Sequence, residues 1–164
     1  MMNASEKIVT LEDLVARLEK VRESGQTVVF TNGCFDLLHV GHVRYLAAAR
    51  SQGDLLIVGL NSDASVRLIK GPKRPIVRQK HRAEVLASLM CVDYVVLFEE
   101  PDPLRLIQTV KPDVLVKGED WAEDAIIGAE DVKSGGGKIV RIAFVEEGST
   151  TGIIQTILRL HQGD

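Results

Sequence analysis

The segment Thr-Asn-Gly-Cys-Phe-Asp-Leu-Leu-His-Val-Gly-His, residues 31–42, gathers the residue types best suited to chemistry in this chain. His39 and His42 are three residues apart, so on a helix their imidazoles can face the same site. Gly41 lets the backbone approach a ligand closely. A helix that starts here would point free amide groups and its positive dipole end at an anion. The pattern predicts a phosphate site where two imidazoles stabilise charge that develops during transfer.

Two alternatives to this interpretation are a chance pair of histidines and a zinc site. Because only 4 of the 164 residues are His, a chance His-X-Gly-His is roughly a one-in-a-hundred event. Zinc ligands would require further partners, and the segment has no nearby Cys pair and no His-Glu-X-X-His sequence. We therefore predict phosphate chemistry and no metal held by protein ligands.

A second candidate is the basic segment between Lys70 and Arg82, the densest positive stretch of an otherwise acidic chain, which also contains glycine and proline. A run of charges is often only a solvated surface. Beside a phosphate site, cations on a loop that closes would offset the repulsion between two bound anions and exclude water. The segment is therefore interpreted as a phosphate-gripping loop.

Short apolar runs alternate with helical patterns and predict the elements that hold these segments. The expected strands cover 27–31, 54–60, 94–98, 113–117 and 138–143. The expected helices cover 11–24 behind a Thr10 cap, then 42–52, 62–70, 79–90, 103–110, 122–134 and 151–161. Alternation of this kind is typical of an α/β fold with a parallel sheet.

The predicted fold is a Rossmann-like, doubly wound, five-stranded parallel sheet in a single domain, 1–164, with a core from about 26 to 161. The last helix is expected to close the sandwich. In such sheets, ligands bind beyond the carboxyl ends of the strands, where the strand order reverses. The expected functional segments therefore follow strands one, two, four and five, at 32–42, 61–63, 118–121 and 145–151.

Composition restricts the class of partner. The net charge is −3, with 45% hydrophobic and 26% charged residues, which is ordinary for a folded protein and argues against nucleic-acid or membrane surfaces. Cys34 and Cys91 form no Cys-X-X-Cys pair, and the N-terminus carries Glu6 and Glu12 where a secretory signal would be apolar. We expect a cytoplasmic protein with small-molecule partners, and composition leaves a homodimer open.

Five stretches together resemble the signature of the nucleotidyltransferase superfamily that includes cytidylyltransferases and pantetheine-phosphate adenylyltransferase. They are 31–42, Gly-Pro-Lys-Arg-Pro-Ile at 71–76, His-Arg-Ala-Glu-Val-Leu-Ala-Ser-Leu at 81–89, Lys-Pro-Asp-Val-Leu-Val-Lys-Gly-Glu-Asp-Trp at 111–121 and Gly-Ser-Thr-Thr at 148–151. From about Ile8 to Leu160 the chain resembles the adenylyltransferase domain of bacterial enzymes that make ADP-heptose for lipopolysaccharide. In that family the domain is often fused to a sugar kinase, which these 164 residues do not include.

The resemblance implies transfer of AMP from ATP, with Mg²⁺, to a sugar 1-phosphate such as D-glycero-β-D-manno-heptose 1-phosphate. It implies that the histidine pair and the basic loop act on the phosphates, so the catalytic candidates are His39, His42, Lys70 and Arg74. The nucleotide-binding candidates are Asn32, Gly33, Cys34, Phe35, Gly41, Lys117, Gly118, Asp120, Trp121, Ser149, Thr150 and Thr151. The substrate-binding candidates are Asp36, Asn61, Asp63, Lys73 and Arg82.

Several of these residues have structural alternatives. Asp36 could cap the turn that follows it rather than orient a substrate. Trp121 could attach a helix to the sheet instead of covering a base. The hydroxyls of residues 149–151 could cap the last helix as well as bind phosphate oxygens.

Two departures from the superfamily pattern affect the choice of activity. Many members carry Arg or Lys where this chain has Ile154, and glycerol-phosphate cytidylyltransferases carry an Arg where it has 144–146, Phe-Val-Glu. The resemblance thus favours the heptose type and leaves the tail of the triphosphate to the basic loop. The alternatives that stay open are another phosphorylated acceptor, such as glycerol 3-phosphate with CTP, and a nucleotide-binding regulatory module that has lost catalysis.

Overall fold

The computed structural model describes residues 3–143 and 148–161. Within them, six parallel strands form one sheet in the order β1-β4-β3-β2-β5-β6. The strands are β1 (Ile8–Val9), β2 (Val28–Gly33), β3 (Leu55–Asn61), β4 (Tyr94–Phe98), β5 (Val114–Gly118) and β6 (Lys138–Ile142). The helices are α1 (Ala4–Lys7), α2 (Leu11–Glu23), α3 (Val40–Arg50), α4 (Asp63–Lys70), α5 (Gln79–Ala87), α6 (Leu104–Val110), η1 (Glu123–Ala125, a 3₁₀ turn), α7 (Ala129–Ser134) and α8 (Thr150–Leu160).

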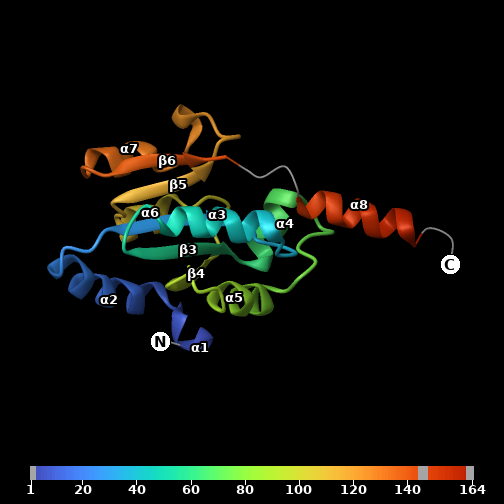
Figure 1. The fold of residues 1–164 in the computed structure, drawn as a ribbon, viewed down its shortest axis with the longest axis horizontal. Coiled ribbons are helices and arrows are strands. Elements are labelled where there is room, and N and C mark those ends of the chain that lie inside the picture. The colour runs from blue at the N-terminus through green and yellow to red at the C-terminus, as the bar shows by residue number, and fades with distance from the viewer. Residues whose placement is uncertain (1–2, 144–147, 162–164) are drawn as a thin grey trace.

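Two hydrophobic cores lie on opposite faces of this sheet. Alternate residues of β2 serve them: Phe30 packs with α2, α6 and α7, whereas Val29 packs with α3 and α5. Figure 1 shows the helices on both sides of the strands. Because both faces are covered, the central strands are almost continuously apolar, and all seven residues of β3 are buried. The predicted Rossmann-like, doubly wound α/β fold is confirmed.

The strand order reverses at β2, which lies between β3 and β5. From β2 the chain builds outward through β3 and β4 on one flank, and later through β5 and β6 on the other. A crevice therefore opens beyond the carboxyl end of β2, where the loops of the two flanks diverge. This is the position that the 31–42 segment occupies.

Three expectations about the elements were wrong. The sheet has a sixth strand, Ile8–Val9, which pairs in parallel with β4 but is too short to show a periodicity. The expected helix 122–134 is divided into η1 and α7, because Gly128 adopts a φ of 83° that a continuous helix does not allow.

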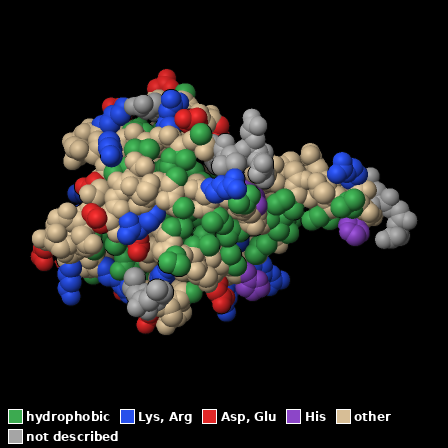
Figure 2. All heavy atoms as spheres, in the orientation of Figure 1, with side chains coloured by type: hydrophobic (Ala, Val, Ile, Leu, Met, Phe, Trp, Pro, Cys, Tyr) green, Lys and Arg blue, Asp and Glu red, His purple; other side chains and the backbone are tan. Residues whose placement is uncertain are grey.

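The third correction concerns α8, which does not close the sandwich. None of its residues is buried, and it projects from the body of the molecule (Figure 1). Ile157 and Leu160 are 51% and 69% exposed. Figure 2 shows hydrophobic side chains along α8 and on the body at its base. Among the described residues, no helix combines the length and apolar character needed to cross a membrane.

Candidate active site

The loop between β2 and α3 makes a tight turn over the carboxyl end of the sheet. Phe35 and Leu37 have φ values of 44° and 50°, in the left-handed region that non-glycine residues seldom adopt. His39 is the N-cap residue of α3, and its side chain makes no capping hydrogen bond. The imidazole is therefore not used to satisfy the amides of the first helical turn.

The two histidines form a stacked pair. Their ring centroids are 3.9 Å apart with an interplanar angle of 29°. The Phe35 and His42 rings meet edge to face, with centroids 5.3 Å apart. Burial lowers the pKa of His39, while burial and the adjacent His39 lower the pKa of His42 to about 4. Both rings are thus neutral at pH 7.

Each histidine also has a buried ring nitrogen without a protein partner. Nδ1 of His39 and Nδ1 of His42 make no hydrogen bond within the part of the chain that the structure describes. Buried polar atoms are usually satisfied, so two orphaned atoms side by side indicate a place where a ligand completes the bonding. A neutral imidazole can donate one hydrogen bond and accept another.

Gly41 has a packing role that the sequence did not reveal. A Cβ atom at this position would lie 2.9 Å from Cε1 of His39 and 3.3 Å from the carbonyl oxygen of Gly148. Any side chain here would displace the His39 ring. Gly41 therefore keeps the histidine pair in position. The close approach of a ligand at Gly41 stays a prediction.

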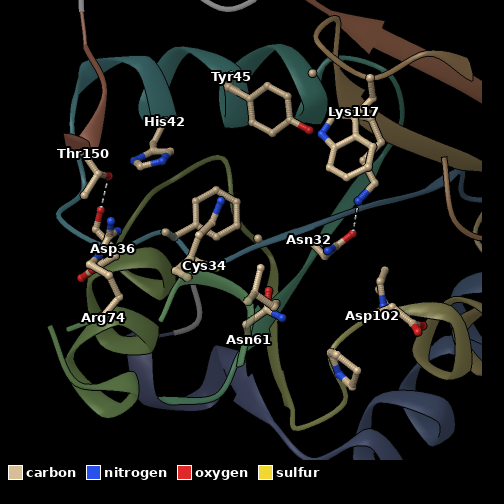
Figure 3. Close-up of a pocket in the computed structure, with 18 of the residues that line it drawn as sticks. Asn32, Cys34, Asp36, His42, Tyr45, Asn61, Arg74, Asp102, Lys117 and Thr150 are labelled. Carbon is tan, nitrogen blue, oxygen red and sulfur yellow. Dashed lines mark hydrogen bonds and ion pairs between the residues drawn. The ribbon is translucent and has the colours of Figure 1, made fainter. Parts of the chain in front are cut away.

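A pocket of about 420 Å³ opens in front of His42, whereas His39, which stacks on His42, does not line it. It is lined by Asn32, Gly33, Cys34, Phe35, Asp36, His42, Tyr45, Asn61, Ile69, Lys70, Arg74, Pro101, Asp102, Pro103, Lys117, Gly118, Trp121, Ile127, Thr150 and Thr151. Figure 3 shows its labelled residues, which come from β2 and the loop after it, α3, β3, the basic loop, the segment after β4, β5 and the start of α8. Most of the predicted site residues therefore meet in one cavity.

Asp36 connects three segments of the site. Its carboxylate, which is fully buried, accepts hydrogen bonds from Arg74 Nε at 2.7 Å and from the amides of Ile76 and Val77 at 2.8 and 2.9 Å. Its carbonyl oxygen accepts a bond of 2.6 Å from Thr150 Oγ1. Burial alone would raise the pKa of Asp36, but the bonds from Ile76, Val77 and Arg74 to the carboxylate lower it. Asp36 therefore clamps the basic loop and the start of α8, and because it also lines the pocket, its predicted contact with the substrate stays a prediction.

Arg82 and Asp63 do not line the pocket, contrary to expectation. The Arg82 side chain is 1% exposed and donates to the carbonyl oxygens of Cys34, Asn61 and Val77 and, at 2.8 Å, to Asp63 Oδ1. Its guanidinium is occupied by groups of the protein, so it joins the ends of β2 and β3 to α5. Asp63 is held by the same ion pair and by the backbone amide of Gln79.

Lys117 forms the wall on the β5 side of the pocket. Its amine donates to Oδ1 of Asn32 and lies 5.9 Å from the centre of the Trp121 ring. Burial lowers the pKa of Lys117 to about 8, although Asp120 acts in the opposite direction. A buried ammonium beside an aromatic ring is well suited to an anionic or polar part of a nucleotide.

Three other predicted residues do not line the pocket. Ser149 caps α8 by accepting a hydrogen bond from Gly152 N at 2.9 Å, and Lys73 and Asp120 are exposed outside the pocket. Burial raises the pKa of the Cys34 thiol, so this pocket residue is not an activated nucleophile.

Six pocket residues were missed: Tyr45, Ile69, Pro101, Asp102, Pro103 and Ile127. Tyr45 shares a buried network with Thr31 Oγ1 at 2.8 Å and the carbonyl oxygen of Val116 at 3.2 Å, and burial raises its pKa to about 12. Residues 101–103 follow β4, and the same rule about carboxyl ends would have found them had it been applied to every strand.

No three His, Cys, Asp or Glu side chains within residues 3–143 and 148–161 gather as metal ligands. The pocket contains one imidazole, His42, and two carboxylates, of which Asp36 is paired with Arg74.

Residues 30–156 match the family described as cytidylyltransferase-like. The chain is 54% identical over 155 residues to the bifunctional protein HldE of Geobacter metallireducens, covering 94% of this chain and 32% of that protein. It is 55% identical over 158 residues to the bifunctional protein HldE of Syntrophotalea carbinolica, covering 96% and 32%. The chain thus spans about a third of the length of these relatives.

Two solved structures resemble the fold. A lipopolysaccharide core biosynthesis protein from Thermoplasma volcanium GSS1 has a TM-score of 0.64 and 31% identity, over 74% of this chain and 99% of that one. A pantoate-β-alanine ligase from Francisella tularensis has a TM-score of 0.62 and 17% identity, over 96% of this chain and 79% of that one. The second likeness concerns the fold alone.

Proposed function

This chain belongs to the cytidylyltransferase-like family of nucleotidyltransferases, and we propose that within this family it transfers AMP from ATP to a sugar 1-phosphate. The products are an ADP-sugar and pyrophosphate. The acceptor that the resemblance to the ADP-heptose enzymes supports is D-glycero-β-D-manno-heptose 1-phosphate. ATP as the donor is consistent with a cytoplasmic enzyme.

The observation that carries this proposal is the stacked, neutral pair His39 and His42, with two orphaned ring nitrogens at the reversal of strand order. Neutral imidazoles can donate N–H bonds to the α-phosphate and to the oxygen that leaves with pyrophosphate. Such bonds strengthen as negative charge develops, which stabilises the transition state more than the bound substrate.

The reaction is an in-line displacement. An oxygen of the sugar phosphate forms a bond to the α-phosphorus of ATP while the bond from that phosphorus to the pyrophosphate oxygen breaks. The attacking oxygen is already an anion, so no protein base has to remove a proton. Catalysis then consists of positioning and charge stabilisation.

Cations on the wall of the pocket support this role. Lys70 ends α4 and lines the pocket, and Arg74 is held there by Asp36. Two phosphorylated substrates repel each other, and these side chains would reduce that repulsion. Mg²⁺ accompanies ATP in this scheme and would be held by the phosphate oxygens of the nucleotide.

The choice of substrates is tested by measuring pyrophosphate release. We expect activity with ATP and heptose or hexose 1-phosphates, and little with glycerol 3-phosphate or with CTP. Activity with CTP and glycerol 3-phosphate alone would overturn the proposal. ATP binding without any pyrophosphate release would favour a regulatory nucleotide-binding module.

The variant His42→Ala tests the role of the histidine pair. The control is His81→Ala, because His81 is exposed on α5. Loss of a transition-state donor should lower kcat by about 100-fold to 1,000-fold. The control should keep the kcat of the unmodified protein. A His42→Ala variant with a higher KM and an intact kcat would refute the catalytic role.

A further inference from the structure

The pocket has a flank that the proposed chemistry does not use. Asn61 ends β3, and Asp102 follows β4, the strand that pairs with β3 in the register Asn61↔Phe98. Both residues line the pocket. They lie on the opposite side of β2 from Lys117, in β5, and from Trp121, which follows β5. The two labelled residues of this flank lie along the lower side of the pocket in Figure 3.

The orientation of the Asn61 amide follows from its neighbours. Ser65 Oγ donates its single hydrogen to the carbonyl oxygen of Glu100 at 2.7 Å, so toward Asn61 it can only accept. The group of Asn61 that faces Ser65, at 2.9 Å, must therefore be the Nδ2 donor. The remaining oxygen, Oδ1, has no partner among the described residues, although Asn61 is only 3% exposed.

Asp102 also has an acceptor oxygen without a hydrogen-bond partner among the described residues. Its Oδ1 accepts a hydrogen bond of 2.9 Å from the amide of Leu104, at the start of α6. Its Oδ2 has no partner within the described part of the chain. Pro101 and Pro103 on either side have no backbone N–H to offer. The side chains and prolines of this flank thus provide hydrogen-bond acceptors, whereas Lys70 and Arg74 elsewhere in the pocket provide donors.

A ligand group that binds against acceptors must bring donors. A phosphate would be repelled by the Asp102 carboxylate and would find no donor on Asn61 Oδ1, but it would find donors on His42 and Arg74. Hydroxyl groups fit the acceptor flank, because each brings one O–H donor. The pocket therefore distinguishes the two ends of a phosphorylated polyol.

We propose that Asn61 and Asp102 determine acceptor specificity by accepting hydrogen bonds from ring or side-chain hydroxyls of the sugar. The inference rests on the proposed function and names the two residues that would recognise the hydroxyl groups of its acceptor. A site built to bond hydroxyls rejects analogues that lack them, because its own polar groups are then left unpaired. The acceptor phosphate then faces the histidine pair.

The first test is Asp102→Asn. This change keeps an oxygen for the Leu104 amide but replaces the free carboxylate oxygen by an amide nitrogen, which cannot accept. Loss of a hydrogen bond to a charged group should raise KM for the sugar 1-phosphate about tenfold or more, with the KM for ATP unchanged. Glu99→Gln removes a charge from the same loop without touching this flank and should leave both KM values unchanged.

The second test uses deoxy analogues of the sugar 1-phosphate with the unmodified protein, so it does not depend on the folding of a variant. One analogue should lose about as much kcat/KM as Asp102→Asn does. That analogue should lose almost nothing further in the variant, because both changes remove the same bond.

Failures of the two proposals are distinguishable. Absence of pyrophosphate release with every sugar phosphate would refute the proposed function. Two outcomes would refute only the specificity role. In the first, Asp102→Asn turns over sugar phosphates with an unchanged KM for the acceptor. In the second, the loss of kcat/KM caused by Asp102→Asn adds fully to the loss caused by every deoxy analogue.

Discussion

His42 is kept neutral by burial and by the adjacent His39, which together lower its pKa to about 4. A bound triphosphate would place several negative charges beside this ring. An adjacent opposite charge favours the protonated imidazolium and raises its pKa. Nucleotide binding and protonation of His42 should therefore be coupled.

We predict that binding of Mg-ATP at pH 5.5 is accompanied by proton uptake. Titration calorimetry in two buffers of different ionisation enthalpy measures the number of protons. The protein with His42 should take up more protons than His42→Gln, and ATP affinity should rise more steeply as the pH falls from 7 to 5.5. Identical proton uptake in the two proteins would contradict the coupling, and His81→Gln is the matched control.

Lys117 should reduce the stability of the free protein. Its pKa of about 8 lies below the ordinary value for lysine, so below pH 8 the folded state holds a buried charge at a cost. We predict that Lys117→Met raises the free energy of unfolding at pH 7 by on the order of 1–3 kcal/mol, while ATP affinity is lost. Urea denaturation and nucleotide titration measure the two effects.

The pH dependence gives this prediction a further check. Between pH 8 and the ordinary lysine pKa, the unfolded chain binds a proton that folded Lys117 does not. The stability contribution of this residue therefore rises with pH over that interval, and Lys117→Met should lack the rise. A less stable Met variant at pH 7 would mean that the bond to Asn32 outweighs the cost of burial.

For individual residues, the sequence predicted which residue types line the site better than it predicted what each residue does. The spacing of His39 and His42 indicated the phosphate chemistry, and Lys70 and Trp121 do line the pocket. The partners of Asp36 and Arg82 were not predictable, because each bonds to segments far away in the chain. Local patterns carry no information about which distant group will occupy a charged side chain.

Among the elements, the loop before α3, the basic loop and the start of α8 are joined through Asp36. We predict that Asp36→Asn lowers kcat/KM for both substrates by about tenfold or more, because an amide oxygen cannot accept all three bonds of the carboxylate. Hydrogen exchange at the amides of Ile76 and Val77 should accelerate in the same variant.

Asp54→Asn is the matched control for this change. Asp54 also bonds to a backbone amide, that of Thr27 at 2.8 Å, but at the opposite end of the strands. The Asp54→Asn variant should keep the kcat/KM of the unmodified protein for both substrates. Unchanged exchange at Ile76 and Val77 in Asp36→Asn would show that the clamp does not hold the loop.

Elements with a strong periodicity were predictable within one to three residues, because a buried strand or an amphipathic helix must place apolar residues at a fixed interval. The strand 94–98 has the predicted bounds, and Thr10 caps α2 as expected. β1 could not be predicted, since two residues show no period. The exposed position of α8 was also unpredictable, because an apolar stripe does not reveal what it packs against.

For the molecule as a whole, α8 contributes no buried side chain. We predict that removal of residues 153–164, which keeps Thr150 and Thr151 in the pocket, changes the Tm by only a few degrees, because exposed positions contribute little to stability. Thermal denaturation at several protein concentrations measures the effect.

A contrary result would be informative about assembly. If truncation lowered the Tm by more than about 10 °C and light scattering showed a smaller particle, a second copy of the chain would cover α8 in solution. The Tm of the full chain would then rise with protein concentration. The homodimer stays a prediction until this measurement.

The reversal of strand order at β2 has a consequence for the diversification of this fold. The histidines follow the one strand that belongs to both flanks, whereas Asn61 and Asp102 belong to one flank and Lys117 and Trp121 to the other. Under the proposed assignments, loops after β3 and β4 can be exchanged to accept a new acceptor without disturbing the nucleotide. The same arrangement offers protein engineers a transferase in which the donor site and the acceptor site can be redesigned separately.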